Sequence, residues 1–116
     1  MVVPHPFDSM RRSAFRISDE EASFVDAIEG FNGRSILQTY NRQAVVFAKN
    51  NNLPIVAGSD AHNANEIGLA GIITDSHDIK EAILKGDIST FGKTSPWLLV
   101  NHGRAQARKI WRRATE

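Results

Sequence analysis

An aspartate and a histidine, two residues apart, directly follow a short apolar run in this chain. The run spans residues 54–59 (PIVAGS), and Asp60 and His62 come after it. If the run is a buried parallel strand, both residues stand at its C-terminal edge, where α/β folds place their binding loops. Residues i and i+2 of an extended segment point the same way, so the two side chains can converge. Carboxylate and imidazole together suit zinc, manganese or iron in hydrolytic sites.

A third candidate ligand, His5, follows a short apolar start at residues 1–3. If that start is a strand, His5 lies just after its C-terminal end, at the same edge of a parallel sheet as Asp60. The flanking Pro4 and Pro6 fix the backbone φ and would hold a ligand in place. A simple loop residue is the alternative. Asp8 could accept a hydrogen bond from His5 or only form a turn.

Other polar residues have weaker signals. Glu29 lies towards the end of an expected strand and could point into the same cleft or into solvent. Ser59 could donate a hydrogen bond to Asp60 or only help to form the turn. For His77 and His102, a surface or structural role is favoured, because each lies in a polar stretch at the start of an expected helix.

The elements that must position these residues alternate between strand and helix. Strands are expected at residues 1–3, 27–31, 54–57, 71–74 and 88–91, and helices at 19–24, 35–49, 75–85 and 96–113, with a helical turn at 66–69. Such alternation predicts an α/β fold with about four or five mostly parallel strands flanked by helices. These strands are too few to close a barrel alone, and 116 residues predict a single domain.

Composition excludes several classes of site and location. The chain has no cysteine, which rules out disulfides and thiolate metal ligands. The sequence contains no apolar run as long as a membrane span and no signal peptide, so we expect a cytoplasmic protein without a membrane partner.

Taken together, the motifs resemble the PHP (polymerase and histidinol phosphatase) family. Residues 54–62 (PIVAGSDAH), closely followed by 66–68 (EIG), resemble the family's last metal-binding motif. Residues 3–6 (VPHP) resemble its upstream His-Pro motif, and residues 27–32 (AIEGFN) resemble the strand between the two. The order and spacing of all three agree with the family, and the resemblance covers roughly residues 1–75.

The resemblance implies a distorted β/α barrel with a metal cluster at the strand ends and phosphoesterase chemistry by metal-activated water. It makes His5, Asp60 and His62 metal ligands and places Glu29 at a strand end near the site, without a ligand role. Asp8 and Ser59 stay possible supporting residues because of their positions beside the ligands. The cofactor would be a divalent metal (zinc, manganese or iron), and the substrate a phosphorylated small molecule or a nucleotide. The resemblance names no catalytic residue in this sequence.

The family's opening His-x-His motif is absent from this sequence. We therefore expect the chain to correspond to the C-terminal portion of a PHP domain, as a fragment, a truncated member or one half of a split assembly. Its fold would be a truncated barrel, its metal site partial or absent, and its phosphoesterase activity incomplete or weak.

A basic C-terminal helix, expected within residues 96–116, supports a different class of function. Arg104, Arg108 and Arg112 recur at every fourth residue and form one stripe that can neutralise nucleic-acid phosphates. A solvated helix face with cations near its C-terminus is the alternative. An apolar side of the same helix is expected to dock on the body of the protein: Ala107, Ile110, Trp111 and Ala114.

A third hypothesis is that the chain is a non-catalytic interaction module. An open parallel sheet leaves an uncovered edge, and an incomplete barrel exposes apolar strand faces. Formation of a homo-oligomer, or pairing with a missing N-terminal half, would cover both.

Overall fold

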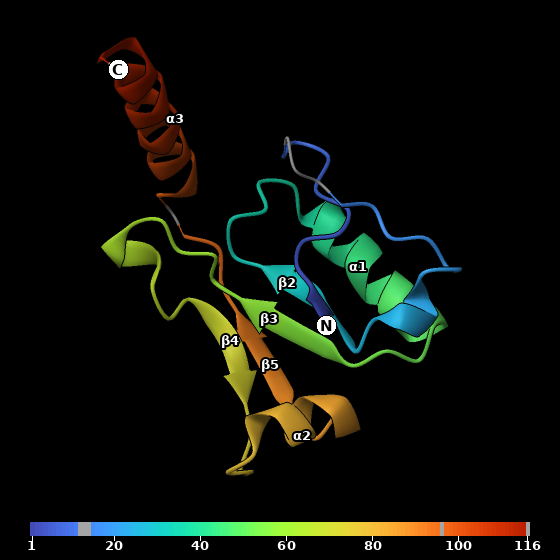
Figure 1. Cartoon of the computed structure of the whole chain (residues 1–116). Helices are drawn as coiled ribbons and strands as arrows, with labels where there is room; N and C mark the ends of the chain where they lie inside the picture. Colours follow the sequence, from blue (N-terminus) through green and yellow to red (C-terminus); the bar gives the residue numbers. More distant parts are fainter. Residues whose placement is uncertain (12–14, 96, 116) are drawn as a thin grey trace.

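The computed structural model describes residues 1–11, 15–95 and 97–115, without the side chains of residues 102 and 105. The chain is α/β, as predicted (Figure 1). Its elements are β1 (Val2–Val3), β2 (Ala27–Asn32), α1 (Gln38–Asn50), β3 (Ile55–Gly58), β4 (Ala70–Ile73), α2 (Ile79–Lys85), β5 (Ser89–Gly92) and α3 (Leu98–Thr115), with 3₁₀ turns at Ala22–Phe24 and Ala64–Glu66.

A three-stranded parallel sheet in the order β1-β2-β3 forms the centre of the molecule, with α1 packed on it (Figure 1). The core lies between this helix and the sheet, and the 3₁₀ turn at Ala22–Phe24 adds to it. Its buried apolar side chains are Val3, Ile17, Ala22, Val25, Ile28, Ala44, Phe47 and Ala48. The carboxyl ends of the three strands therefore lie at one edge of a sheet that a packed core holds rigid.

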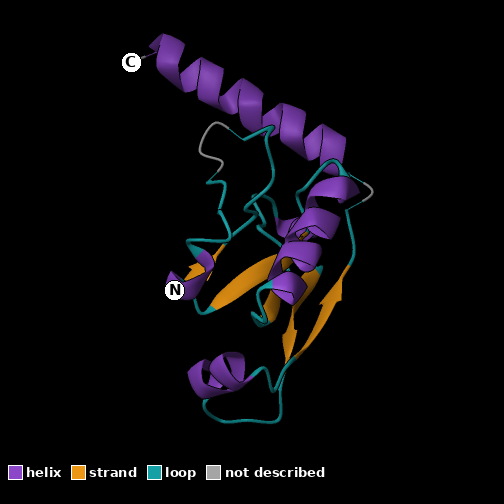
Figure 2. Cartoon of the chain, turned by 90° about the vertical axis from the view of Figure 1, so that its right-hand side faces the viewer, coloured by secondary structure: helices purple, strands orange, loops and turns teal. Residues whose placement is uncertain are grey.

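The second pair of strands corrects the predicted sheet. β4 and β5 pair antiparallel, from Ala70 opposite Gly92 to Ile73 opposite Ser89. The helix between them, α2, lies beyond the end of the pair rather than across a face, so the chain returns in the opposite direction (Figures 1 and 2). Alternation of strand and helix thus predicted the elements but not this direction. The described residues form no closed barrel, and the truncated barrel is not confirmed.

Two expected helices are shorter in the structure. At residues 19–24 the Glu21 carboxylate accepts from the Ser18 amide and hydroxyl, as at a helix start, but Val25 is already extended, so only the 3₁₀ turn at Ala22–Phe24 forms. α2 begins later than expected, after Asp78, whose carboxylate accepts from the backbone amide of Glu81 at 2.9 Å. Helical spacing predicts that Ile79, Ala82 and Ile83 face inward. Ala82 is buried, but the prediction is wrong for Ile79, which is 57% exposed.

The predicted docking of the apolar side of α3 is also wrong. Ile110 and Trp111 are 68% and 69% exposed, and the helix meets the body through its first turn, where Leu98 and Asn101 are buried (Figure 2). Nine residues, about two and a half turns, separate Asn101 from Ile110 and put them on opposite sides of the helix. None of the described helices is both long and apolar enough to cross a membrane.

A β-bulge in β2 sets the direction of its polar side chains. Glu29 pairs with Val56 of β3, but the next pair joins Phe31 to Ala57, which leaves Gly30 as the extra residue. In a regular strand, residues three apart point to opposite faces. Because of the bulge, Glu29 and Asn32 come together, and the Asn32 amide donates to the Glu29 carboxylate at 3.0 Å.

The loop after β3 is held by the buried carboxylate of Glu66. It accepts hydrogen bonds from the Arg34 guanidinium (2.9 Å to each oxygen), the His62 backbone amide (2.7 Å) and the Asn101 side chain (3.0 Å). Burial alone would raise the pKa of Glu66, but these donors outweigh it and lower the pKa to about 2. One carboxylate therefore joins the segment after β2, the loop after β3 and the start of α3.

The contribution of Glu66 to stability is expected to be complete above about pH 4.5 and to disappear as the pH falls towards about 2. In the unfolded chain Glu66 takes up its proton near pH 4.5, whereas in the folded chain it does so only near pH 2. Acid therefore favours unfolding between these two pH values. Urea denaturation at a series of pH values should show the free energy of unfolding decline across this window.

Glu66→Gln should lower the free energy of unfolding by about 3 kcal/mol at neutral pH, because it removes the charge that balances buried Arg34. It should also make the free energy of unfolding depend less on pH. The exposed Glu20 provides the control, Glu20→Gln, and equal profiles for both variants would contradict the prediction.

Gly30→Ala is expected to lower the free energy of unfolding by roughly 1–3 kcal/mol, since a Cβ there would lie 2.5 Å from Ile55 Cγ2 and 3.0 Å from Val45 Cγ2. Gly103→Ala in α3 is the matched control, because its Cβ would meet nothing within 4 Å. That change should be neutral or stabilise by about 0.5–1 kcal/mol. Denaturant melts of both variants provide the comparison, and a Gly30→Ala protein as stable as wild type would refute the tight packing at the bulge.

Candidate functional site

The carboxyl ends of the parallel strands bring several predicted site residues together. His5 follows β1, Glu29 belongs to β2 and Asp60 follows β3. The backbone amide of His5 donates to the Glu29 carboxylate at 2.8 Å, and the Asn32 side-chain amide donates to Glu29 at 3.0 Å and to Asp60 at 3.3 Å. Burial raises the pKa of Glu29 despite these donors. The sheet edge thus assembles a partly buried carboxylate cluster.

The backbone is unusual at two of the predicted ligands. His5 has φ +32° and Asp60 has φ +50°. In the described chain the one other non-glycine residue with positive φ is Asn52, which follows the end of α1, a common place for asparagine in this conformation. Left-handed backbone at a non-glycine residue costs roughly 1–3 kcal/mol, least at Asn and Asp, and is concentrated at functional sites.

The ring of His62 is held by the residue two positions before it. His62 Nδ1 lies 2.7 Å from the backbone carbonyl oxygen of Asp60 and 3.8 Å from its Oδ1. A carbonyl oxygen can only accept, so Nδ1 carries the hydrogen, and in the neutral imidazole Nε2 keeps a free electron pair. The side chain is 43% exposed, so this nitrogen belongs to a ring that solvent reaches.

Asp8 and Arg11 complete the cluster. The guanidinium of Arg11 donates from Nε to Asp8 at 3.0 Å, from Nη1 to Asp60 at 2.6 Å and from Nη2 to Asn32 Oδ1 at 3.0 Å. Burial opposes the charge of Arg11, but these carboxylates outweigh it and raise the pKa of the guanidinium. Asp8 is 3% exposed and also accepts from the Ser35 hydroxyl at 3.3 Å.

The predicted metal ligands are not gathered into one metal-binding group. Within the residues that the structure describes, no three His, Asp or Glu side chains are placed to hold a metal ion together. Nδ1 of His5 is buried and, in the described part of the chain, has no hydrogen-bond partner. The assignment of His5, Asp60 and His62 as ligands therefore stays a prediction.

Asp8 has the turn-forming role that was the alternative to a contact with the His5 ring, since its carboxylate accepts from the backbone amide of Met10 at 3.2 Å. The carboxylate of Asp8 binds Arg11 rather than the His5 ring, and the two residues meet through a backbone hydrogen bond from the Asp8 amide to the His5 carbonyl. In the described contacts the Ser59 hydroxyl makes no hydrogen bond to Asp60. His77 is exposed, as favoured, and the His102 side chain lies outside the described part.

Sequence reasoning missed Arg11, Asn32, Arg34 and Glu66. The sequence marks Asn32 only as the last residue of the strand motif at 27–32, and Glu66 only as part of a helical turn and a family motif. Arg11 lies in an irregular loop where no period marks one arginine over another. The string Glu66-Ile67-Gly68 beside the metal motif was the one available signal.

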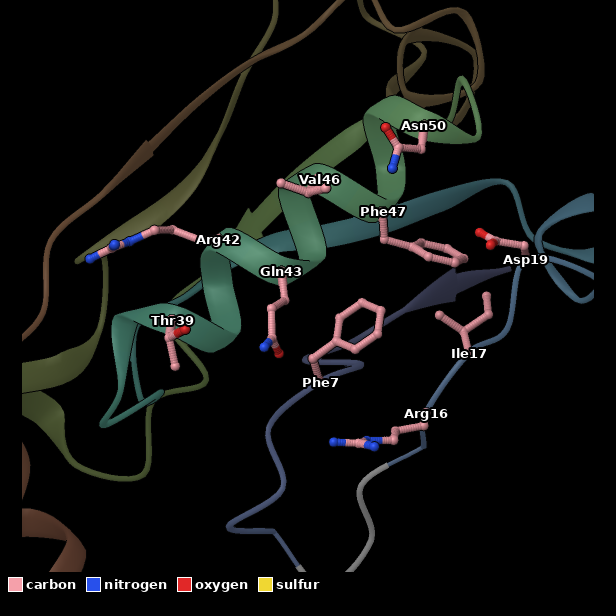
Figure 3. A pocket seen from close by; sticks show the side chains of 10 residues that line it. All are labelled: Phe7, Arg16, Ile17, Asp19, Thr39, Arg42, Gln43, Val46, Phe47 and Asn50. Carbon is pink, nitrogen blue, oxygen red and sulfur yellow. The ribbon is translucent and has the colours of Figure 1, made fainter.

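A hollow of about 640 Å³ lies elsewhere, against α1 (Figure 3). The rings of Phe7 and Phe47 meet at its floor with their centroids 5.6 Å apart. None of the predicted site residues belongs to its lining, which consists of Phe7, Arg16, Ile17, Asp19, Thr39, Arg42, Gln43, Val46, Phe47 and Asn50. The candidate site is therefore the cluster at the strand ends and not this hollow.

Comparison with known families supports the relation that the motifs indicate. Residues 38–88 match the family model described as PHP-associated. The matched segment includes Asp60 and His62 and begins after His5. No curated protein and no solved structure matches the chain. The match at residues 38–88 confirms the predicted relation of this segment to the C-terminal portion of the PHP family.

Proposed function

We propose that the chain is a PHP-like phosphoesterase with a partial site for one divalent cation, bound by His5, Asp60 and His62. The observation that carries the proposal is the left-handed backbone of His5 and Asp60, at φ +32° and +50°. Left-handed backbone at non-glycine residues is concentrated at functional sites, and here it occurs at two of the three proposed ligands. The orphaned, buried Nδ1 of His5 supports the same role, because a metal ion would satisfy it.

The arrangement of His62 fits a metal ligand as well. Metal-binding histidines usually donate their second ring N–H to a carbonyl or carboxylate, which fixes the tautomer and orients the ring. The contact from Nδ1 to the Asp60 carbonyl has that form and leaves Nε2 to bind a metal. Imidazole nitrogen and carboxylate oxygen suit zinc, manganese or iron.

The other residues of the cluster orient the ligands. The Asn32 side-chain amide bridges Glu29 and Asp60, and Glu29 holds the His5 amide. When bound, the metal would lower the pKa of a water molecule and polarise a phosphoryl oxygen. A phosphorylated small molecule or a nucleotide is the proposed substrate, and the β1-β2-β3 sheet is the proposed remnant of the family's barrel.

Metal binding is the first test of this function. Chelator-treated wild type should take up about one zinc, manganese or iron ion per chain, measured by elemental analysis after dialysis. Asp60→Asn and His62→Ala should each reduce uptake, and hydrolysis of p-nitrophenyl phosphate should be slow and follow the metal content. His77→Ala, an exposed histidine before α2, is the control. Wild type without metal after incubation with each ion would refute the proposal.

The position of α3 favours nucleic acid as a second candidate partner. Arg108 donates from Nη2 to the Asn63 side chain at 3.2 Å, which places the basic face of the helix beside the loop of Asp60 and His62. Arg104 and Arg112 share this face and are exposed. A phosphate backbone lying along the three arginines would pass next to the candidate site.

Replacing Arg104, Arg108 and Arg112 together with glutamine should weaken binding of a single-stranded RNA oligonucleotide. The logarithm of the affinity falls with the logarithm of the salt concentration, and each lost phosphate contact makes this slope shallower by about 0.7. The slope of the triple variant should therefore be shallower by about 2. Fluorescence anisotropy at several salt concentrations measures it. The control is glutamine at three exposed cations outside α3, namely Arg42, Lys80 and Lys93. Equal slopes for the two triple variants would rule out this role of α3.

A further inference from the structure

Arg11 occupies the position at which a cation would meet Asp60. Its Nη1 lies 2.6 Å from Asp60 Oδ2, a short charge-assisted hydrogen bond. The three guanidinium nitrogens bind three acceptors, on Asp8, Asp60 and Asn32, that come from three different segments. Its side chain is 21% exposed, so the group is largely enclosed by the cluster that it neutralises.

The cluster requires a positive charge. Asp8 is almost fully buried and the Asp60 side chain is 25% exposed, so neither carboxylate is fully compensated by water. Without a cation, the two would repel each other and Glu29, which shares the Asn32 amide with Asp60. Arg11 supplies that charge from within the chain, and a divalent ion on Asp60 Oδ2 would need the same oxygen.

The loop that carries Arg11 also carries His5. The Asp8 amide donates to the His5 carbonyl and the Arg11 amide donates to the Asp8 carbonyl, both at 3.2 Å, so successive turns connect the three residues. The orphaned His5 Nδ1 and the guanidinium therefore belong to one short hydrogen-bonded segment. A change in the contacts of Arg11 reaches the backbone of His5 through Asp8.

We propose that Arg11 is an internal cation that competes with a divalent metal for the carboxylate of Asp60, so that metal binds only when the guanidinium leaves. This inference rests on the proposed metal site. It makes Arg11 the residue that sets metal affinity, acting through Asp60 without binding the metal itself.

The test is calorimetric titration of chelator-treated protein with Mn²⁺ and with Zn²⁺. Arg11→Gln should bind the ion about tenfold or more tightly than wild type, because it removes a full charge in contact with Asp60. Arg11→Lys keeps the charge but loses the planar guanidinium, so its metal affinity should lie between those of wild type and Arg11→Gln. In the absence of metal, Arg11→Gln should melt at a lower temperature than wild type, and saturating Mn²⁺ should raise that temperature more than it does for wild type.

Two further variants separate the possible outcomes. Arg42→Gln removes an exposed charge from α1 and should leave the metal affinity unchanged. The double variant Arg11→Gln/Asp60→Asn should lose the increase in metal affinity that Arg11→Gln alone gives. Wild type and Arg11→Gln of equal measurable affinity would overturn the competition while leaving the metal site in place. No binding by either protein would overturn both proposals. If Arg11→Gln does not fold, the Arg11→Lys titration decides, since an affinity no higher than that of wild type contradicts the inference.

Discussion

The buried carboxylate of Glu66 is the constraint on which the arrangement of the site depends. Removing a carboxylate from water is costly, and the cost is offset only while Arg34, the His62 amide and Asn101 all donate to it. These donors come from the segment after β2, the loop after β3 and the first turn of α3. Because the ion is buried, all three segments have to keep their positions together, and the loop of Asp60 and His62 is fixed as a consequence.

The second constraint is charge balance at the carboxyl ends of the parallel strands. Three strands running in one direction end at one edge, and Asp8, Glu29 and Asp60 meet there. Such a cluster is stable only with a cation, and in this chain a guanidinium supplies it. The geometry that gathers these carboxylates therefore attracts an arginine, and under the proposed competition a metal ion would need the Asp60 oxygen that the guanidinium binds.

α3 shows how a few polar contacts decide which face of a helix is covered. Its apolar residues predicted docking, yet Asn101 is the residue that binds, to Glu66 and to Asn65 at 2.8 Å. Two hydrogen bonds within a buried network outweigh loose apolar contact with the body. This attachment turns Ile110 and Trp111 to solvent and places Arg108 against Asn63, next to the candidate site.

The sequence by itself determined the local elements and the motif residues. Apolar runs between turn residues fixed β2 and β3, helical spacing fixed α1, and His5 and Asp60 were correctly expected just after strands, because these signals are local and periodic. Only the tertiary structure decided the antiparallel return of β5, the bulge that turns Glu29 towards Asn32, and the partners of Arg11 and Glu66. These features join residues far apart in the chain, and burial and charge compensation select such partners only once the segments have packed together.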